Sequence, residues 1–181
     1  MYNPHIFLMS YQFRTEQWVA APIERVFRFF ANPGNLPRLM SPWMQVELLR
    51  VKIVAPPGIE ADQATITDIA PFAGAGSELV ASYRALPVLP FRITSTARIT
   101  QFAMNRYFED VQKQGPFRSW NHRHEFMTEE RNGVNGTVIR DIVEYDIGFG
   151  WLGVLAQKLF VGPQMRRTFV HRQKMLAKLL T

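Results

Sequence analysis

The chain has 181 residues, of which 47% are hydrophobic and 20% charged, so a single domain over residues 1–181 with a substantial core is expected and intrinsic disorder is not. Because it contains no cysteine, disulfides, thiolate nucleophiles and cysteine-ligated zinc are excluded. The net charge of +6 is spread along the chain without a run of five Lys or Arg, so nucleic-acid binding is not expected.

Alternating polar and apolar residues predict a first strand over residues 11–19. Pro22 marks the start of a short amphipathic helix, which Asn32, Pro33 and Gly34 end. Residues 36–40 predict a second short helix.

A series of strands follows, separated by turns that contain Gly, Pro or Asn. The predicted strands cover residues 46–54, 64–69, 78–85, 92–102, 105–112, 118–129 and 137–147. Their spacing favours an antiparallel meander. From Trp151 onward the apolar residues recur with helical spacing, and Gly162-Pro163 is expected to kink or interrupt this helix.

This order predicts an α+β fold, in which a curved antiparallel sheet of about seven strands wraps around a long C-terminal helix. A curved sheet cannot close tightly on a rigid helix along its whole length, so a cavity is expected between them. Segments 71–76 and 86–90, rich in small residues or proline, are expected to gate its mouth.

The predicted strand 118–129 places two histidines on one face. Alternate side chains of a strand share a face, so Trp120, His122, His124 and Phe126 point the same way. Large aromatics beside two imidazoles suit the wall of a semi-polar pocket better than a plain core.

The strand 137–147 carries a carboxylate on its more apolar face. Asp141 shares that face with Val143 and Tyr145, and a buried carboxylate requires a partner. We expect His122 or His124 on the preceding strand to pair with it, which would fix the tautomer of the imidazole and raise its pKa. The pair would serve the structure or, alternatively, proton transfer.

Asp110 is expected to cap the turn near Gly115 or to pair with Arg118, and the alternative places it in the polar cluster. The histidine pair could bind a metal with Asp110 or Asp141 as third ligand. Because no further histidine lies nearby in the sequence, no metal and no cofactor are predicted.

The basic residues near the C-terminus are interpreted as the solvated face of the last helix. They are Arg166, Arg167, His171, Arg172, Lys174 and Lys178. The longest apolar run, residues 147–156, is too short for a membrane span, and residues 6–9 lack the basic segment of a signal peptide. We therefore expect a soluble cytoplasmic protein, monomeric or homodimeric, whose basic helix allows transient membrane contact.

Three stretches of the chain resemble the START-related (SRPBCC) superfamily. The first stretch is residues 21–30 with Asn35, Leu36 and Leu39. The second consists of Phe108, Asp110, Gln112, Gly115-Pro116-Phe117, Trp120, His122, His124 and Phe126. The third consists of Asp141, Val143 and Tyr145 with Gly150, Leu152-Gly153 and the terminal helix through Arg172. This superfamily has the helix-grip fold and includes START lipid-transfer domains, plant pathogenesis-related allergens and polyketide cyclases/dehydratases. The last two stretches are similar to a bacterial subgroup of unassigned function.

The resemblance implies a deep hydrophobic cavity that binds a hydrophobic or aromatic small molecule, such as a lipid or polyketide-like compound. The expected lining is Leu152, Leu155, Leu159 and Phe169 on the helix, and Ile93, Ala97, Phe108, Asp110, Trp120, Phe126, Val143 and Tyr145 on the sheet. A binder without catalysis is favoured.

Two alternatives remain beside the binder. One is an aromatic cyclase/dehydratase in which His122 or His124 is the base, Asp141 orients it and a tyrosine stabilises the oxyanion. The other is a membrane-associated lipid or quinone carrier.

Overall fold

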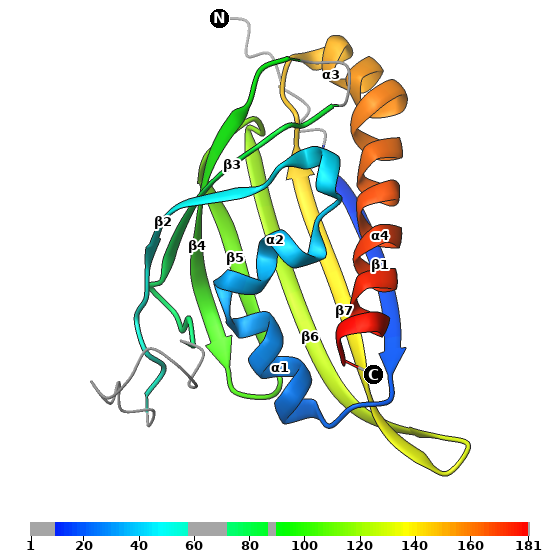
Figure 1. The fold of residues 1–181 in the computed structure, drawn as a ribbon. Helices are drawn as coiled ribbons and strands as arrows, with labels where there is room; N and C mark the ends of the chain where they lie inside the picture. Colours follow the sequence, from blue (N-terminus) through cyan, green and yellow to red (C-terminus); the bar gives the residue numbers. More distant parts are fainter. Residues whose placement is uncertain (1–9, 58–71, 87–89, 181) are drawn as a thin grey trace, which may run out of the picture.

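The computed structural model describes residues 10–57, 72–86 and 90–180. It has an α+β helix-grip fold, in which one antiparallel sheet of seven strands is covered by helices (Figure 1). The strands are β1 (Tyr11–Val19), β2 (Glu47–Lys52), β3 (Glu78–Tyr83), β4 (Ile93–Ala103), β5 (Tyr107–Gln114), β6 (Ser119–Arg131) and β7 (Val134–Asp146). Their order in the sheet is β1-β7-β6-β5-β4-β3-β2.

The helices follow the predicted order. After β1 come α1 (Ile23–Ala31) and α2 (Leu36–Leu39), with 3₁₀ turns at Pro33–Asn35 and Pro42–Met44. The expected strand over 64–69 lies outside the described residues, as do the apolar patch 6–9 and residues 71 and 87–89 of the expected gating segments. The remaining predicted strands are all present, with ends shifted by a few residues.

The C-terminal helix runs from α3 (Gly150–Ala156) through a π-helical turn (Gln157–Val161) into α4 (Gly162–Leu180). It therefore continues past Gly162-Pro163 without a break. In the π-helical turn, the N–H of Gly162 donates to the carbonyl of Gln157, five residues earlier. Pro163 has no N–H to donate, and the wide turn before it lets the helix continue past this missing donor.

One core cluster joins α1 and α4 to the same face of the sheet. Phe27 of α1 is fully buried, and its ring lies 5.1 Å from that of Phe126 and 6.1 Å from that of Phe108. Leu176 and Leu180 of α4 belong to the same cluster. These apolar contacts fix the strands β5 and β6 that carry the polar residues described below. In the described part of the chain, no helix is both long and apolar enough to cross a bilayer.

Candidate functional site

A cavity of about 280 Å³ lies between the sheet and the segment that carries α1 and α2. Most of its wall is apolar: Phe29, Phe30, Leu36, Leu39 and Met40 come from the helical side, and Leu79, Ala81, Ala97, Ile99, Phe108, Phe117 and Trp120 from the sheet side. Asp110, His122, His124 and Arg172 supply a polar wall. Glu78 and several uncharged polar residues also reach the wall, so the cavity combines a mostly apolar interior with a cluster of four ionisable groups on one side.

Four of the residues expected to contact a ligand line this cavity: Ala97, Phe108, Asp110 and Trp120. Contact with a ligand remains a prediction for them. The expected lining residues Phe126, Val143, Tyr145 and Phe169 instead lie in two packed core clusters. Ile93, at the start of β4, is not among the residues that line the cavity.

The cavity lies farther from the C-terminal helix than the sequence suggested. The Phe169 ring lies 4.9 Å from that of Phe13 on β1, so α4 packs directly on the sheet and fills the expected space. Leu152, Leu155 and Leu159 are 47–57% exposed, because α3 follows the end of β7 and buries only Gly153. Among the described residues of this helix, Arg172 is the one that reaches the cavity.

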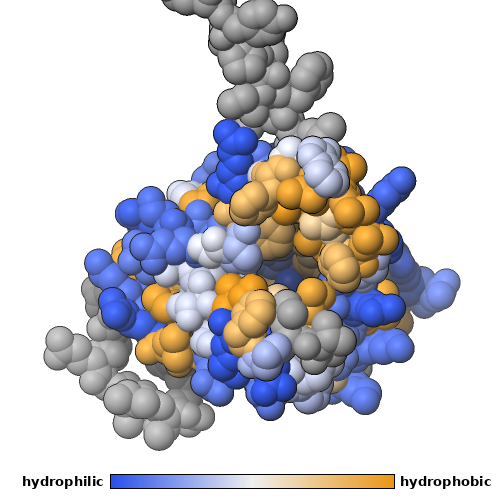
Figure 2. All heavy atoms as spheres, turned by 90° about the horizontal axis from the view of Figure 1, so that it is seen from above, coloured by the Kyte–Doolittle hydropathy of each residue, from blue (hydrophilic) through white to orange (hydrophobic). Residues whose placement is uncertain are grey.

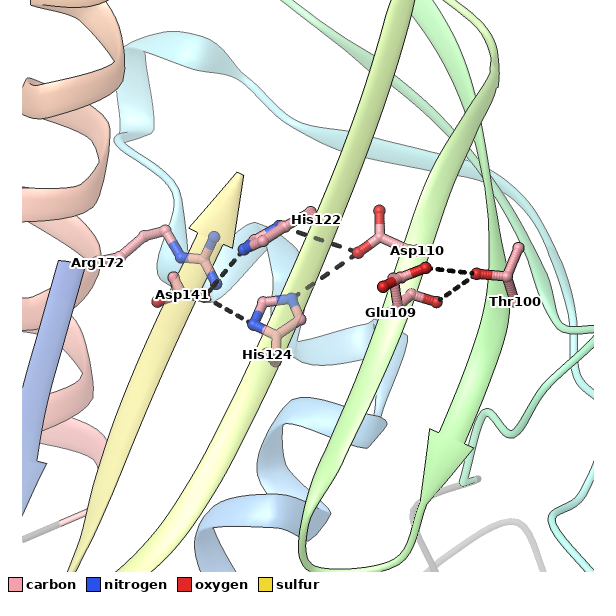
Figure 3. Close-up of polar contacts among 7 residues, drawn as sticks. All are labelled: Thr100, Glu109, Asp110, His122, His124, Asp141 and Arg172. Atoms are coloured by element: carbon pink, nitrogen blue, oxygen red, sulfur yellow. Dashed lines mark hydrogen bonds and ion pairs between the residues drawn. The ribbon is translucent and has the colours of Figure 1, made fainter. Parts of the chain in front are cut away.

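The β6 strand carries the two histidines inward, as the alternation predicted. His122, His124 and Phe126 are buried, whereas the residues between them are partly exposed. The register places His124 opposite Asp141 of β7, and His122 opposite Asp110 of β5. Three neighbouring strands thus bring two imidazoles between two carboxylates (Figure 3).

Asp141 contacts both imidazoles through one oxygen. His122 Nε2 lies 2.9 Å from Asp141 Oδ1 in a hydrogen bond. His124 Nδ1 lies 2.7 Å from the same oxygen, although this contact is poorly aligned for a hydrogen bond. The expectation of an inward carboxylate that pairs with the histidines agrees with this geometry.

Arg172 of α4 lies next to Asp141. Its guanidinium lies 4.0 Å from Asp141 Oδ1 and 4.8 Å from the centre of the Phe169 ring, and the residue is 8% exposed. Burial alone would raise the pKa of Asp141, but Arg172 and the two imidazoles outweigh it and hold this pKa well below its usual value. Asp141 is therefore an ionised carboxylate.

The sequence interpretation placed Arg172 on the solvated face, and the structure corrects this. The helical spacing contained the signal, because Arg172 continues the series of Met165, Phe169 and Leu176, which are all buried. A basic residue in phase with an apolar stripe indicates a buried cation with a partner.

The pKa values of both histidines also differ from expectation. Burial lowers the pKa of His122, and the neighbouring imidazole lowers it further. Burial likewise lowers the pKa of His124, and Arg172 opposes its protonation, while Asp141 acts in the other direction. The ring centres are 3.9 Å apart, so two imidazolium charges would repel strongly. Both histidines are therefore neutral, whereas the sequence predicted a raised pKa.

Asp110 faces the histidines rather than capping a turn. Its Oδ2 lies 3.9 Å from His122 Nδ1 and 3.8 Å from His124 Nε2. Arg118 instead pairs with Asp146 at 3.8 Å. Burial raises the pKa of Asp110, although His122 and Arg172 act against this increase. The β5–β6 register directs Asp110 inward, so the alternative that placed it in the polar cluster is correct.

Two chemical capacities follow from this arrangement. Asp110, His122 and His124 offer ligand atoms that lie within 4.8 Å of one another, as a metal site requires. The same imidazoles could take up a proton from a guest in the cavity. The tyrosine expected to stabilise an oxyanion has no match among three strand tyrosines, since Tyr83, Tyr107 and Tyr145 do not line the cavity.

Comparisons with known proteins agree with this architecture. Residues 19–174 match the family described as polyketide cyclase / dehydrase and lipid transport. No curated protein matches the chain.

Similar solved structures include three that cover almost the whole chain. Ginseng major latex-like protein 151 from Panax ginseng has a TM-score of 0.61 and 8% identity over 95% of this chain and 98% of that chain. A START superfamily protein from Mycobacterium smegmatis has a TM-score of 0.59 and 16% identity over 93% and 96%. TTHA0849 from Thermus thermophilus has a TM-score of 0.56 and 18% identity over 92% and 94%. At these identities the likeness shows the fold alone. Because the family match spans most of the sequence, the chain belongs to the polyketide cyclase / dehydrase and lipid transport family, within the START-like superfamily that its residues resemble.

Proposed function

We propose that the chain binds a hydrophobic or aromatic small molecule in the cavity beneath α1 and α2. The observation that carries this proposal is an apolar space of about 280 Å³ with one polar wall. Ligand sites commonly combine apolar walls with a few polar groups, and their volumes run from roughly 300 to 1,000 Å³. The volume here lies just below that range, which favours a compact aromatic or polyketide-like guest over a complete two-chain lipid.

The polar wall is expected to contribute to affinity and orientation. Burial of about 200 Å² of apolar guest surface would supply about 5 kcal/mol before the costs of ordering the guest. That amount supports only weak binding. A guest hydroxyl that donates to the free ring nitrogen of His122 or His124, or a guest carbonyl that accepts from Arg172, would add a hydrogen bond in a region of low dielectric constant. We therefore expect a guest with at least one carbonyl or hydroxyl group.

Native mass spectrometry of the protein purified from its own host tests this proposal. We expect a co-purifying small molecule, and we expect Ala97→Phe to abolish its retention because the new ring fills the cavity beside β4. Thr94→Phe is the matched control, since Thr94 is exposed on the same strand. Equal retention in both variants would show that any bound molecule lies elsewhere.

A second candidate is a cyclase or dehydratase, favoured by the position of both imidazoles on the cavity wall. A free ring nitrogen of His122 or His124 would take a proton next to a guest ketone, and elimination would then release water. Arg172 would face the developing oxyanion in place of the expected tyrosine. The test compares turnover of poly-β-ketone analogues by wild type and His124→Gln. Loss of turnover with retained guest binding supports catalysis, and a wild type without turnover removes this candidate.

A third candidate, a carrier that docks on membranes, is favoured by the exposed apolar end of the molecule. Phe149 and Trp151 are 78% and 74% exposed, and Leu152, Leu155, Leu159 and Phe160 are exposed beside them. We call these six residues the α3 patch. Figure 2 looks down on this end and shows apolar side chains gathered beside a hollow. Vesicle binding, described in the Discussion, tests this role.

A further inference from the structure

We propose that Asp110, His122 and His124 form a binding site for a divalent first-row transition-metal ion on the polar wall of the cavity. This site would consist of two imidazoles and one carboxylate from the adjacent strands β5 and β6. It does not depend on the identity of the organic guest.

The contacts of Asp141 determine which imidazole nitrogens are free. A carboxylate only accepts hydrogen bonds, so the 2.9 Å hydrogen bond to Asp141 Oδ1 places the ring proton of His122 on Nε2. His124 Nδ1 lies 2.7 Å from the same oxygen, which is too close for two lone pairs to face each other, so the ring proton of His124 lies on Nδ1 although this contact is poorly aligned for a hydrogen bond. The lone pairs then lie on His122 Nδ1 and His124 Nε2. These are the two nitrogens that face Asp110 Oδ2, at 3.9 and 3.8 Å. Three electron-pair donors therefore converge on one point.

The spacing of these donors suits an ion better than direct contact. Separations of 3.9 and 3.8 Å are too long for hydrogen bonds between the imidazoles and Asp110. Ligand atoms bound at about 2.0–2.2 Å from one metal ion lie about 3.0–3.5 Å apart. The two separations from Asp110 exceed this by a few tenths of an ångström, and all three ligand atoms lie within 4.8 Å of one another, so the side chains would draw closer together around an ion.

Asp141 and Arg172 supply the outer shell that a metal site requires. A ligating histidine usually donates its other N–H to a carboxylate, which orients the ring and increases its basicity. Asp141 orients His122 through a hydrogen bond and lies 2.7 Å from His124 Nδ1, while a guanidinium nitrogen of Arg172 lies 4.0 Å from the same carboxylate oxygen. In Figure 3 these groups follow one another in space, from Arg172 of α4 through Asp141 of β7 and the two imidazoles of β6 to Asp110 of β5.

Charge and ligand type indicate the class of ion. The cluster holds two carboxyl groups and one guanidinium, so Asp110, when ionised, has no cation of its own and would favour a bound metal ion. Two imidazoles with one carboxylate suit zinc, iron(II), cobalt(II) or manganese(II) better than calcium or magnesium, which prefer oxygen ligands throughout. Three protein ligands leave coordination positions open toward the cavity, where a guest oxygen could bind. Because the ion would occupy both lone pairs, this role excludes the use of either histidine as a base.

The test uses full-length protein treated with a chelator and then titrated with cobalt(II) alone. Binding is measured by equilibrium dialysis with elemental analysis and by the visible absorption of the bound ion. We expect one cobalt ion per chain in the wild type, with affinity reduced by at least about tenfold in Asp110→Asn. His171→Gln, which removes a partly exposed histidine of α4, is the matched control and should bind as the wild type does.

Two outcomes overturn the proposal: no saturable binding in the wild type, or less than tenfold weakening in Asp110→Asn. Circular dichroism establishes that this variant is folded. If it is not, paramagnetic NMR of the wild type decides instead. Shifted ring protons of both His122 and His124 support the site, and shifts confined to His171 overturn it.

Discussion

The two ends of the C-terminal helix contrast in what they bury. At the α3 end, Trp151 and Leu155 are exposed, whereas at the α4 end Arg172 is buried against Asp141. Each arrangement opposes the usual preference of apolar residues for the interior and of charge for water. The exposed end is the surface on which the proposed carrier would dock, and the buried end contributes to the polar wall of the proposed ligand site.

The largest effect is expected where the buried cation is removed. Arg172→Met leaves Asp141 buried without its guanidinium, and we expect the free energy of unfolding to fall by about 3 kcal/mol. Chemical denaturation measures this change. Arg167→Met, at an exposed position of the same helix, should change stability by less than about 0.5 kcal/mol. If Arg172→Met lost no more stability than Arg167→Met, the apolar stem that methionine keeps, and not the guanidinium, would be what stabilises the fold.

The next effect is a loss of stability on acidification of the metal-free protein. The folded-state pKa values of His122 and His124 lie below the ordinary histidine value of 6.5, so between that value and the lower folded pKa the unfolded chain binds more protons. Stability is therefore complete above pH 6.5 and falls below it, by up to about 1.4 kcal/mol per pH unit for each histidine. Asp141, with its lowered pKa, adds a further loss below the ordinary aspartate value of 3.8.

Denaturation between about pH 7 and pH 5 in the presence of a chelator measures this dependence. His122→Gln combined with His124→Gln should flatten the curve in that window, while His171→Gln should leave it unchanged. The raised pKa of Asp110 acts in the opposite direction in this window, so the comparison of the wild type with the double histidine variant carries the test. A wild type that loses no more stability on acidification than the double variant would contradict the assigned direction of the two histidine pKa shifts.

A smaller effect is expected at the exposed end. Trp151→Ser combined with Leu155→Ser should weaken binding to phosphatidylglycerol-containing vesicles by about tenfold, because two apolar side chains no longer enter the interface. Sedimentation with vesicles measures this. Val170→Ser is the control, since Val170 on α4 is about as exposed as Leu155 but lies outside the α3 patch. Unchanged binding in the double variant would remove the carrier candidate.

The smallest effect concerns the junction between the two ends. The Tyr145 hydroxyl and the Gln157 amide share a hydrogen-bond contact of 2.8 Å where the helix widens. Tyr145→Phe should therefore lower the free energy of unfolding by about 1 kcal/mol or less. Thermal unfolding compared with Tyr11→Phe, a partly exposed neighbour on β1, measures the difference. A loss well above this value would indicate that Tyr145 also positions the helix.

Local patterns predicted most of the fold and part of the site. Alternation along residues 118–129 and 137–147 placed His122, His124 and Asp141 on the inner face, because the strand period depends on the backbone alone. The inward position of Asp110 depends on the β5–β6 register, which residue types near the turn do not reveal.

The remaining features depend on packing between distant segments. The cavity position follows from contacts of α4 with β1, which are separated by most of the chain. The lowered histidine pKa values follow from burial and from the approach of the two rings. A pairing argument predicts the attraction of Asp141 but not the competing desolvation, and desolvation is the larger effect here.

The π-helical turn at Gln157–Val161 changes the direction in which the side chains of α4 point around the helix axis, compared with those of α3. One additional residue per turn offsets everything beyond it by about 100° relative to a uniform α-helix. Residues that would lie on one face of an uninterrupted α-helix therefore point in different directions in α3 and α4. The insertion or deletion of a single residue in this turn would rotate α4 by about 100° relative to α3 and would thus change which residues each helix exposes.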